Sequence, residues 1–466
     1  MKLLLAEAVN EASAIQTKYA SLGLGYLVAC LPDKLKRNLI IKIAGADTIA
    51  EINNFKPDVV GLSSVSQNFS RAKKIAAYCQ PKGIKVIIGK SHITALPMSL
   101  DKNMDVGIIG EGEETFSEII LLLLENKFIK EELYKIKGIV FHDSDRIVRT
   151  AERALIENLD SLPFPDRRSL GLKPGDNFYL FSSRGCPYRC VFCFSSRFWQ
   201  KIRFHSAEYV VREIKHLVND YGAIRITFCD DLFIADPERL RKIVQLIKQE
   251  KFYKTVKFTV SVRANLISAE SARLLKDLGA DIVTMGLESG CPRVLNLLKG
   301  PSIKIADSRR AIDLLKKNNL QVSASFIIGS PDETRQEILE TLSFIKNSRL
   351  DLFEVNVLAP LPGTPVWDYA LKRGLVSHDM DWEKLEIDFA NNHDDYIILS
   401  EKLNRQQLKE LYDLFMAERR RRDRWLKIKY LYKRPKEILR FLKKKYLAKF
   451  LWIFPSLSFP GMSKKN

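Results

Sequence analysis

The stretch Arg184-Gly185-Cys186-Pro187-Tyr188-Arg189-Cys190-Val191-Phe192-Cys193 sets the chemistry that this 466-residue chain can support. Three of its seven cysteines stand here at the spacing C-x-x-x-C-x-x-C, which is too regular to be a chance arrangement of so rare a residue. From the residues alone, the three thiols fit either a 4Fe-4S cluster with one open iron or a structural zinc site, for which His205 is the nearest fourth ligand.

The cysteine stretch follows an apolar run, and the chain then repeats apolar runs separated by helical patterns. The runs are residues 179–182, 225–228, 257–262, 282–287, 322–328 and 352–358. This alternation is typical of α/β folds with parallel strands. We therefore expect a partial (β/α)6 barrel whose working face lies at the carboxyl ends of its strands.

Charged residues and a glycine follow these predicted strands, where the chain would reach the working face. The positions are Asp230, Asp231, Arg263, Glu288 and Gly329. Adjacent acids can hold an ammonium group, and an arginine can pair bidentately with a carboxylate. Simpler explanations stay open, because the two aspartates could cap the next helix and Arg263 could lie on a strand surface.

The cysteine spacing, its place after the first barrel strand and the aromatic residue before the third cysteine resemble the radical S-adenosylmethionine (radical SAM) superfamily. Residues 286–290 (GLESG) and 360–365 (PLPGTP) resemble two further segments of that superfamily. The resemblance implies an S-adenosylmethionine bound to the open iron and cleaved, after electron transfer from the cluster, to a 5′-deoxyadenosyl radical. The residues implied are Cys186, Cys190 and Cys193 for the cluster, and Phe192, Asp230, Asp231, Arg263, Glu288 and Gly329 for S-adenosylmethionine.

Residues 1–150 alternate short apolar strands with helices from the start, which predicts a doubly wound, Rossmann-like parallel sheet. This region resembles the cobalamin-binding domain that precedes the barrel in the cobalamin-dependent branch of the superfamily. The resemblance implies cobalamin contacts at Ser63, Ser64, Gly89, His92, Gly110 and Glu111. The alternative is a Rossmann-like domain that has lost its ligand and serves as structure.

Two features of this region depart from the resemblance. No D-x-H-x-x-G motif occurs, so no axial histidine is supplied by that route, and His92 is interpreted as a loop residue or a contact to the cobalamin tail. Lys90 stands where the branch commonly has a second glycine. A long side chain at that position would reach the predicted tail pocket.

The predicted organisation is a cobalamin-binding-like domain, a proline-punctuated linker, a radical SAM domain and a helical, basic C-terminal region. Their bounds are 1–150, 151–176, 177–375 and 376–466. The formal net charge is +19, but residues 419–466 hold 17 Lys and Arg against 2 Asp and Glu. The preceding 418 residues, with 58 basic against 54 acidic side chains, are nearly neutral.

Within the basic tail, apolar residues recur at helical spacing, with lysines beside them. They are Leu439, Leu442, Tyr446 and Phe450, followed by Trp452. This pattern predicts an amphipathic helix on an anionic membrane surface, and a solvated helix packed on the barrel is the alternative. No apolar run is long enough to span a membrane, and an acid at Glu7 interrupts any signal-peptide layout. We therefore expect a cytoplasmic enzyme with a peripheral contact at the inner membrane face.

The leading functional hypothesis is a cobalamin-dependent radical SAM enzyme that methylates an unactivated carbon of a small or lipid-like substrate. The resemblance also implies an electron donor such as flavodoxin or ferredoxin. The alternatives are a radical SAM cyclase, oxidoreductase or ring-rearrangement enzyme without methyl transfer, an RNA-modifying radical SAM enzyme, and a cluster-bearing sensor without catalysis. We do not expect a nucleic-acid partner, because tRNA methylthiotransferases carry three cysteines in the first domain, where only Cys30 and Cys79 occur here.

Overall fold

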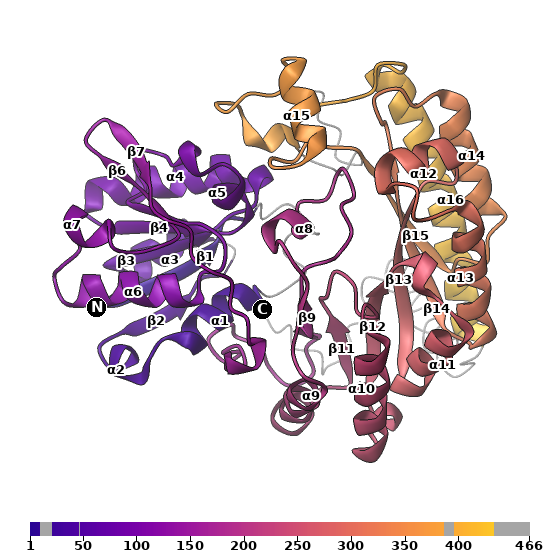
Figure 1. Cartoon of the computed structure of the whole chain (residues 1–466), viewed down its shortest axis with the longest axis horizontal. Coiled ribbons are helices and arrows are strands. Elements are labelled where there is room, and N and C mark those ends of the chain that lie inside the picture. The colour runs from indigo at the N-terminus through magenta and orange to yellow at the C-terminus, as the bar shows by residue number, and fades with distance from the viewer. Residues whose placement is uncertain (10–20, 46, 386–395, 433–466) are drawn as a thin grey trace, which may run out of the picture. The chain divides into compact units, whose positions relative to one another are not determined.

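The N-terminal part of the chain forms a seven-stranded sheet in the order β2-β1-β3-β4-β5-β6-β7 (Figure 1). The computed structural model describes residues 1–9, 21–45, 47–385 and 396–432. The strands are β1 (Lys2–Glu7), β2 (Ile40–Ile43), β3 (Val59–Ser63), β4 (Lys85–Gly89), β5 (Val106–Ile108), β6 (Ile139–Asp143) and β7 (Arg146–Arg149). Strands β1 to β5 are parallel, as predicted, whereas β6 and β7 add an antiparallel hairpin that the alternation of strands and helices did not predict.

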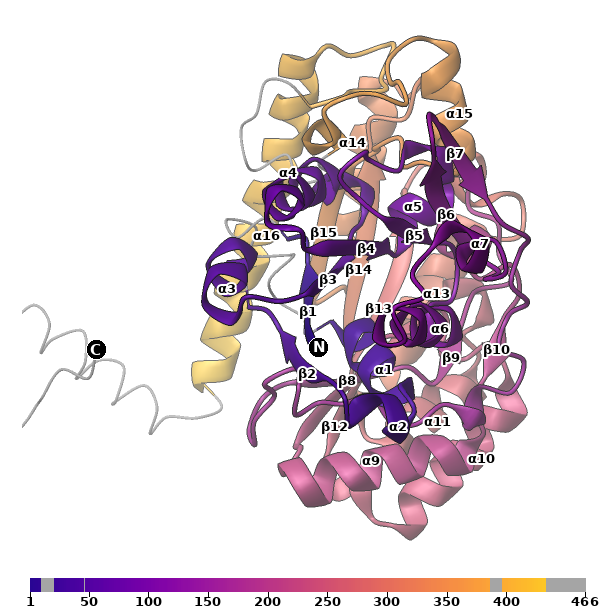
Figure 2. The same cartoon turned by 90° about the vertical axis from the view of Figure 1, so that its left-hand side faces the viewer.

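Helices cover both faces of this sheet (Figures 1 and 2). They are α1 (Leu22–Cys30), α2 (Asp33–Lys36), α3 (Thr48–Phe55), α4 (Phe69–Cys79), α5 (Ser91–Ala95), α6 (Glu113–Leu124) and α7 (Lys130–Leu133). Side chains that alternate along β1 enter different cores, since Leu4 packs with α4 and Leu3 and Leu5 pack with α1 and α6. Burial on both sides explains why the strands are continuous apolar runs. The sheet is therefore doubly wound.

The second sheet has six strands, all parallel, in the order β15-β14-β13-β12-β11-β8. They are β8 (Phe178–Leu180), β11 (Arg225–Phe228), β12 (Lys257–Val262), β13 (Ala280–Glu288), β14 (Gln321–Ile328) and β15 (Leu352–Val357). The helices of this part are α9 (Ala207–Tyr221), α10 (Pro237–Gln249), α11 (Ala269–Leu278), α12 (Pro292–Lys299), α13 (Ile305–Lys317) and α14 (Arg335–Lys346). Each strand pairs with the strand of this sheet that precedes or follows it along the chain. This is the arrangement of a partial (β/α)6 barrel. The predicted fold class is confirmed.

A separate two-stranded ladder holds the cysteine stretch. Strands β9 (Ser183–Arg184) and β10 (Arg203–Phe204) pair antiparallel, and the loop between them, residues 185–202, contains the short helix α8 (Ser195–Phe198). Gly185 opens this loop at φ +93°, and a Cβ there would lie 2.6 Å from the carbonyl oxygen of Lys201. The loop can therefore close on itself only because residue 185 is glycine.

After the barrel, the chain returns to the N-terminal sheet. Helix α15 (Pro365–Lys372) is followed by the 3-10 turn η7 (Trp382–Leu385), where the backbone N–H of Trp382 donates to Ser70 Oγ at 3.1 Å. Trp382 is 2% exposed and joins the core that α4 covers. The chain is thus anchored a second time to the N-terminal domain.

The last described helix is α16 (Arg405–Tyr432). Contacts divide the chain into one unit of residues 1–412 and a second of residues 413–466. The predicted membrane helix around Leu439 and its anchor Trp452 lie outside the described residues. In the part of the chain that the structure describes, no helix is long and apolar enough to cross a membrane.

Candidate active site

The three cysteines of the loop are free and half-buried. The guanidinium of Arg197 donates to the carbonyl oxygens of Cys190, at 3.1 Å, and Cys193, at 2.5 Å. Backbone N–H groups of Ser195 and Ser196 point at the Cys193 sulfur. The loop is therefore held in shape by its own polar groups, with hydrogen-bond donors directed at a sulfur.

Burial raises the pKa of the Cys186 thiol to about 11, so without a metal it is protonated at neutral pH. A positively charged metal centre would reverse this preference, because coordination deprotonates a thiol. Arg263 Nη1 lies 3.5 Å from Cys190 Sγ, and the Arg263 guanidinium lies over the Tyr188 ring at 3.8 Å. N–H donors and a cation around sulfur suit a thiolate-bound iron-sulfur cluster. These residues fit the predicted group.

The zinc interpretation is not supported by the geometry. His205 is buried, lies 3.2 Å from Asp160 through its Nδ1 and stacks on Tyr209 at 4.0 Å. It is therefore engaged away from the cysteines. Among the described residues, no three or more His, Cys, Asp or Glu side chains group around a position for one metal ion. A 4Fe-4S cluster does not need such convergence, since each thiolate binds a different iron.

The two aspartates after β11 have different surroundings. Asp230 is buried and accepts hydrogen bonds from the Ser182 N–H, at 2.6 Å, the Ser182 hydroxyl and the Ser183 hydroxyl, at 2.9 Å. Asp231 is exposed and accepts from Ser195 Oγ at 2.5 Å, beside α8 of the cysteine loop. Asp230 thus holds the strand ends together, and Asp231 is the carboxylate open to a ligand.

Three further predicted contacts lie at the ends of β12, β13 and β14. Arg263 is buried, and its guanidinium also donates to the Lys299 carbonyl at 3.3 Å. Glu288 is buried 3.4 Å from Lys299 Nζ, and its burial raises its pKa despite that lysine. Gly329 has φ +82°, and its N–H donates to Glu333 at 2.8 Å. Their roles toward S-adenosylmethionine stay predictions.

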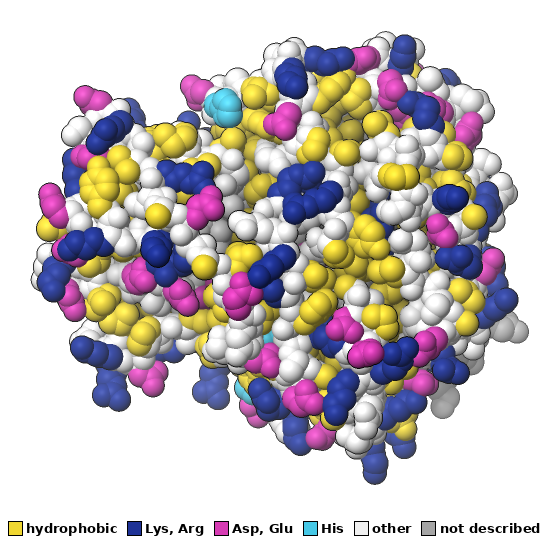
Figure 3. Space-filling model, viewed as in Figure 1, with side chains coloured by type: hydrophobic (Ala, Val, Ile, Leu, Met, Phe, Trp, Pro, Cys, Tyr) yellow, Lys and Arg dark blue, Asp and Glu magenta, His cyan; other side chains and the backbone are white. Residues whose placement is uncertain are grey.

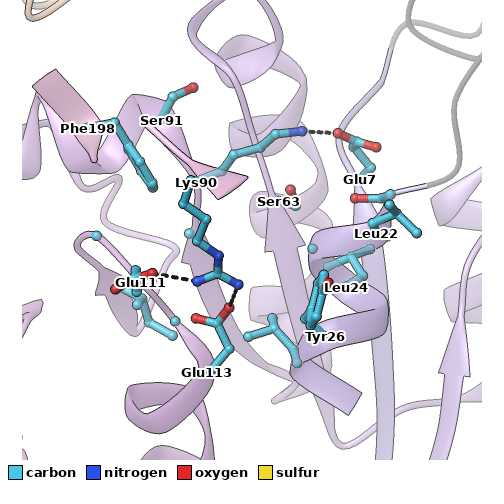
Figure 4. Close-up of a pocket in the computed structure, with 18 of the residues that line it drawn as sticks. Glu7, Leu22, Leu24, Tyr26, Ser63, Lys90, Ser91, Glu111, Glu113 and Phe198 are labelled. Atoms are coloured by element: carbon cyan, nitrogen blue, oxygen red, sulfur yellow. Dashed lines mark hydrogen bonds and ion pairs between the residues drawn. The ribbon is translucent and has the colours of Figure 1, made fainter. Parts of the chain in front are cut away.

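A cavity of about 850 Å³ lies between the cysteine loop and the carboxyl edge of the N-terminal sheet. Phe192 and Cys193 line it from the loop. Of the predicted cobalamin contacts, Ser63, Gly89, Gly110 and Glu111 line it from the sheet edge. Figure 4 shows these two sides, with Phe198 facing the sheet-edge residues Lys90, Ser63 and Glu111. One space therefore joins the edge predicted for cobalamin to the loop predicted for the cluster.

Two predicted cobalamin contacts need correction. His92 is fully buried, hydrogen-bonds Ser66 and Ser99 at 3.1 and 3.0 Å, and lies between Phe69 and Trp382. Ser64 is also fully buried, and its hydroxyl donates to a neighbouring carbonyl. Neither side chain lines the cavity, because both are fully buried and hydrogen-bonded within the N-terminal domain. Both are structural.

Lys90, the departure noted in the sequence, has an unusual backbone. Its φ of 84° and ψ of −164° lie in a region that residues other than glycine almost never occupy. Its side chain reaches across the end of β3 and pairs with Glu7, at the end of β1, above Ser63 (Figure 4). The lysine and its glutamate therefore form part of the cavity floor.

Two charged residues of the cavity, Arg184 and Glu113, were not predicted as functional. Arg184 pairs with Glu111 and with Glu113, each at 2.5 Å, although the sequence separates them by about 70 positions. Burial alone would raise the pKa of Glu111, but Arg203 and Arg184 outweigh it and lower that pKa, so this carboxylate is ionised. A single sequence contains no signal that would show which arginine pairs with acids so far away along the chain.

Comparison with known proteins agrees with this geometry. The family model of the B12 binding domain matches residues 12–120, and that of the radical SAM superfamily matches residues 180–345. An uncharacterised methyltransferase of Pyrococcus horikoshii is 32% identical over 405 residues, which cover 82% of this chain and 86% of the relative. This chain belongs to the cobalamin-dependent radical SAM superfamily.

Two further similar proteins, one curated relative and one solved structure, accompany this radical SAM assignment. The anaerobic magnesium-protoporphyrin IX monomethyl ester cyclase of Cereibacter sphaeroides is 24% identical over 336 residues, and this chain spans 54% of its length. A solved structure of the radical SAM methyltransferase TsrM from Kitasatospora setae, with cobalamin and a 4Fe-4S cluster bound, has a TM-score of 0.65 at 16% identity. That match covers 80% of this chain and 75% of TsrM, and it shows a shared fold.

The radical SAM assignment confirms that the chain is an enzyme and confirms the predicted cofactor set of a 4Fe-4S cluster, S-adenosylmethionine and cobalamin. Which residues hold each cofactor is a separate matter. The three cysteines, Asp231, Arg263, Glu288 and the sheet-edge residues stay predictions for those roles.

Proposed function

We propose that this radical SAM enzyme transfers a methyl group to an unactivated carbon of a small or lipid-like substrate. One observation carries the proposal: a single cavity has Phe192 and Cys193 of the cysteine loop on one side and Ser63 and Gly89 of the B12-binding domain on the other. A substrate between these sides could meet both the radical source and the methyl carrier. The methyltransferase from Pyrococcus horikoshii supports the same reaction class.

The character of the cavity favours an apolar substrate. Aromatic side chains from both domains line it, namely Tyr26, Phe116, Phe181, Phe194, Phe198 and Trp199. The charged side chains that line it in the described residues form two sets, because Glu7 pairs with Lys90, and Glu111 and Glu113 pair with Arg184. A mostly apolar wall with neutralised charges binds hydrophobic or planar molecules.

When bound, the cluster and S-adenosylmethionine supply a 5′-deoxyadenosyl radical, and cobalamin carries the methyl group. The chain would contribute Cys186, Cys190 and Cys193 as cluster ligands and the open carboxylate of Asp231 for the ammonium of S-adenosylmethionine. The aromatic wall would exclude water, which protects a carbon radical from side reactions.

A second candidate is ring formation or rearrangement without methyl transfer. The cyclase from Cereibacter sphaeroides favours it, since that relative matches 68% of this chain. Both candidates need the same cofactors and an apolar cavity. They differ in whether the methyl group of S-adenosylmethionine becomes part of the product.

The test uses S-adenosylmethionine labelled in its methyl group, a hydrophobic extract as substrate and the anaerobically reconstituted enzyme. Methyl transfer predicts that label enters an organic product only when cobalamin is present. Turnover of the extract without any label in the product would establish the second candidate and reject the first.

For the C-terminal region we propose a peripheral contact with anionic membranes. The described start of this region combines Arg419 to Arg422 and Arg424 with the exposed apolar side chains of Trp425 and Ile428. Basic and apolar groups together favour an interfacial helix. Vesicles rich in phosphatidylserine should sediment the full chain but not a version ending at residue 418. Equal sedimentation of the two would reject the contact.

A further inference from the structure

The loop that carries the three cysteines is closed at its base by two arginines. Arg184 of β9 and Arg203 of β10 are direct partners in the antiparallel ladder, so the loop starts after one and ends before the other. Like charges opposite each other across a ladder destabilise it. Both arginines are buried, at 6% and 5% exposure, where salt screens their repulsion little. The base of the loop therefore needs negative charge from another part of the chain.

That negative charge comes from the B12-binding domain. Arg184 Nη1 and Nη2 lie 2.5 Å from Glu111 and 2.5 Å from Glu113, and Arg203 Nη1 lies 2.8 Å from the second oxygen of Glu111. Glu113 is the first residue of α6, and Glu111 lies two residues before it. Dashed lines in Figure 4 mark ion pairs at Glu111 and Glu113, the two acids that pair with the Arg184 guanidinium. Two positive and two negative charges cancel only when this edge of the domain is in place.

The remaining contacts show that the network is shared between the domains. Trp199, inside the cysteine loop, lies 5.2 Å from the Arg184 guanidinium and 5.8 Å from that of Arg203. Tyr26 of α1 approaches Arg184 from the other domain, at 5.5 Å. The N–H of Ile156, in the connection between the domains, donates to Glu111 at 2.7 Å. Each domain therefore supplies both charge and packing to the other.

We propose that Glu111 and Glu113 are positioning residues that couple closure of the cysteine loop to docking of the B12-binding domain, by neutralising Arg184 and Arg203. With the domain displaced, the two facing arginines would repel each other and the loop base would open. Docking of the domain would therefore form both walls of the cavity at once, the one that carries Cys193 and the one at the sheet edge. This inference goes beyond the proposed methyl transfer and does not depend on it, because it concerns the chain's own charges.

Hydrogen exchange in the full-length chain tests the coupling, both after cluster reconstitution and before it. Replacing Glu111 with Gln keeps the shape and removes one charge. We expect amides of residues 185–202 to exchange at least about tenfold faster in Glu111→Gln than in wild type, with β12 to β14 unchanged. The matched control is Glu213→Gln, since Glu213 is fully buried and pairs with Arg167 at 2.6 Å. It should loosen α9 and leave the cysteine loop protected.

A charge rescue separates electrostatic coupling from mere packing. In the double variant Glu111→Gln/Arg203→Gln, one of the two facing cations is also removed, so protection of residues 185–202 should return to within about twofold of wild type. Simple loss of packing would instead make the double variant worse. Glu113→Gln, which leaves Glu111 intact, provides a milder variant if Glu111→Gln does not fold. Three results would overturn the proposal. They are exchange of residues 185–202 at the wild-type rate in both Glu111→Gln and Glu113→Gln, no slowing of that exchange in the double variant, and equally fast exchange of these residues in Glu213→Gln.

Discussion

Lys90, in the cavity wall, has a backbone conformation that lowers the stability of the protein. Its backbone conformation costs a residue with a Cβ about 1–3 kcal/mol relative to glycine. Its ion pair with Glu7 joins partly exposed side chains, and such pairs return at most about 1 kcal/mol. The ion pair therefore does not offset the whole backbone cost of a lysine at this position in the cavity wall.

We therefore expect Lys90→Gly to increase the free energy of unfolding by roughly 1 kcal/mol, because backbone strain outweighs the ion pair. Urea denaturation measures this difference. Lys90→Ala is the control, since it removes the ion pair but keeps the Cβ. If glycine proves no more stabilising than alanine at this position, the strain is not real.

His92 makes a prediction about pH. Burial, aided by the charge of Lys73, lowers its pKa from 6.5 to about 3 in the folded protein. Between pH 3 and pH 6.5 His92 is protonated in the unfolded chain but neutral in the folded protein. The free energy of unfolding therefore keeps its full value above pH 6.5 and decreases below it by about 1.4 kcal/mol per pH unit. Between pH 7 and pH 5, wild type should lose about 2 kcal/mol more than His92→Gln, which can still hydrogen-bond but does not titrate. Equal losses in urea denaturation at the two pH values would show that the ring is not buried as described.

At the scale of elements, the turn after β13 depends on Gly290. A Cβ at this position would lie 2.5 Å from Phe344 Cβ and 2.8 Å from the Thr341 Cα of α14. Neither neighbour can move without moving the helix. Gly290→Ala should therefore destabilise the protein by about 1–3 kcal/mol, measured by urea denaturation. Gly23→Ala in α1 is the contrast, since an added Cβ there would meet nothing within 4 Å beyond its chain neighbours and its own helix backbone. This change should be neutral or stabilising by up to about 1 kcal/mol.

The elements themselves could largely be predicted from the sequence. The predicted strands 225–228 and 257–262 coincide with β11 and β12, in which buried residues alternate with less buried ones. Strands β9 and β10 have two residues each, too few to show any period, and were not predicted. The hairpin of β6 and β7 was missed because strand pairing direction depends on the turn between Asp143 and Arg146, not on hydrophobic pattern.

At the scale of the whole molecule, the site could be predicted only in part. The cysteines and Asp231 could be proposed as cofactor residues because each has a local signature in the sequence, and these roles stay predictions. His92 and Ser64 were wrongly assigned to the cavity because the local pattern does not show which side of a turn faces a ligand. Arg184 was missed because its partners, Glu111 and Glu113, belong to another domain. Long-range pairing of charges needs the assembled fold.

Charge distribution also belongs to this scale. On the face in Figure 3, positive and negative side chains are interspersed. This agrees with the near-neutral balance of residues 1–418, since +15 of the net charge of +19 belongs to residues 419–466. The membrane contact proposed for the basic tail therefore concerns docking, whereas the proposal for the cavity between the domains concerns catalysis.

The central claim is that two cofactor sites act through one cavity, and the most direct measurement is product analysis under anaerobic conditions. The reconstituted enzyme, with cobalamin, a reductant, S-adenosylmethionine and substrate, should form S-adenosylhomocysteine and 5′-deoxyadenosine in about equal amounts, one from each S-adenosylmethionine consumed. Cys186→Ala, which removes a cluster ligand, should abolish 5′-deoxyadenosine. Formation of 5′-deoxyadenosine without any S-adenosylhomocysteine, at full cobalamin occupancy, would contradict the account.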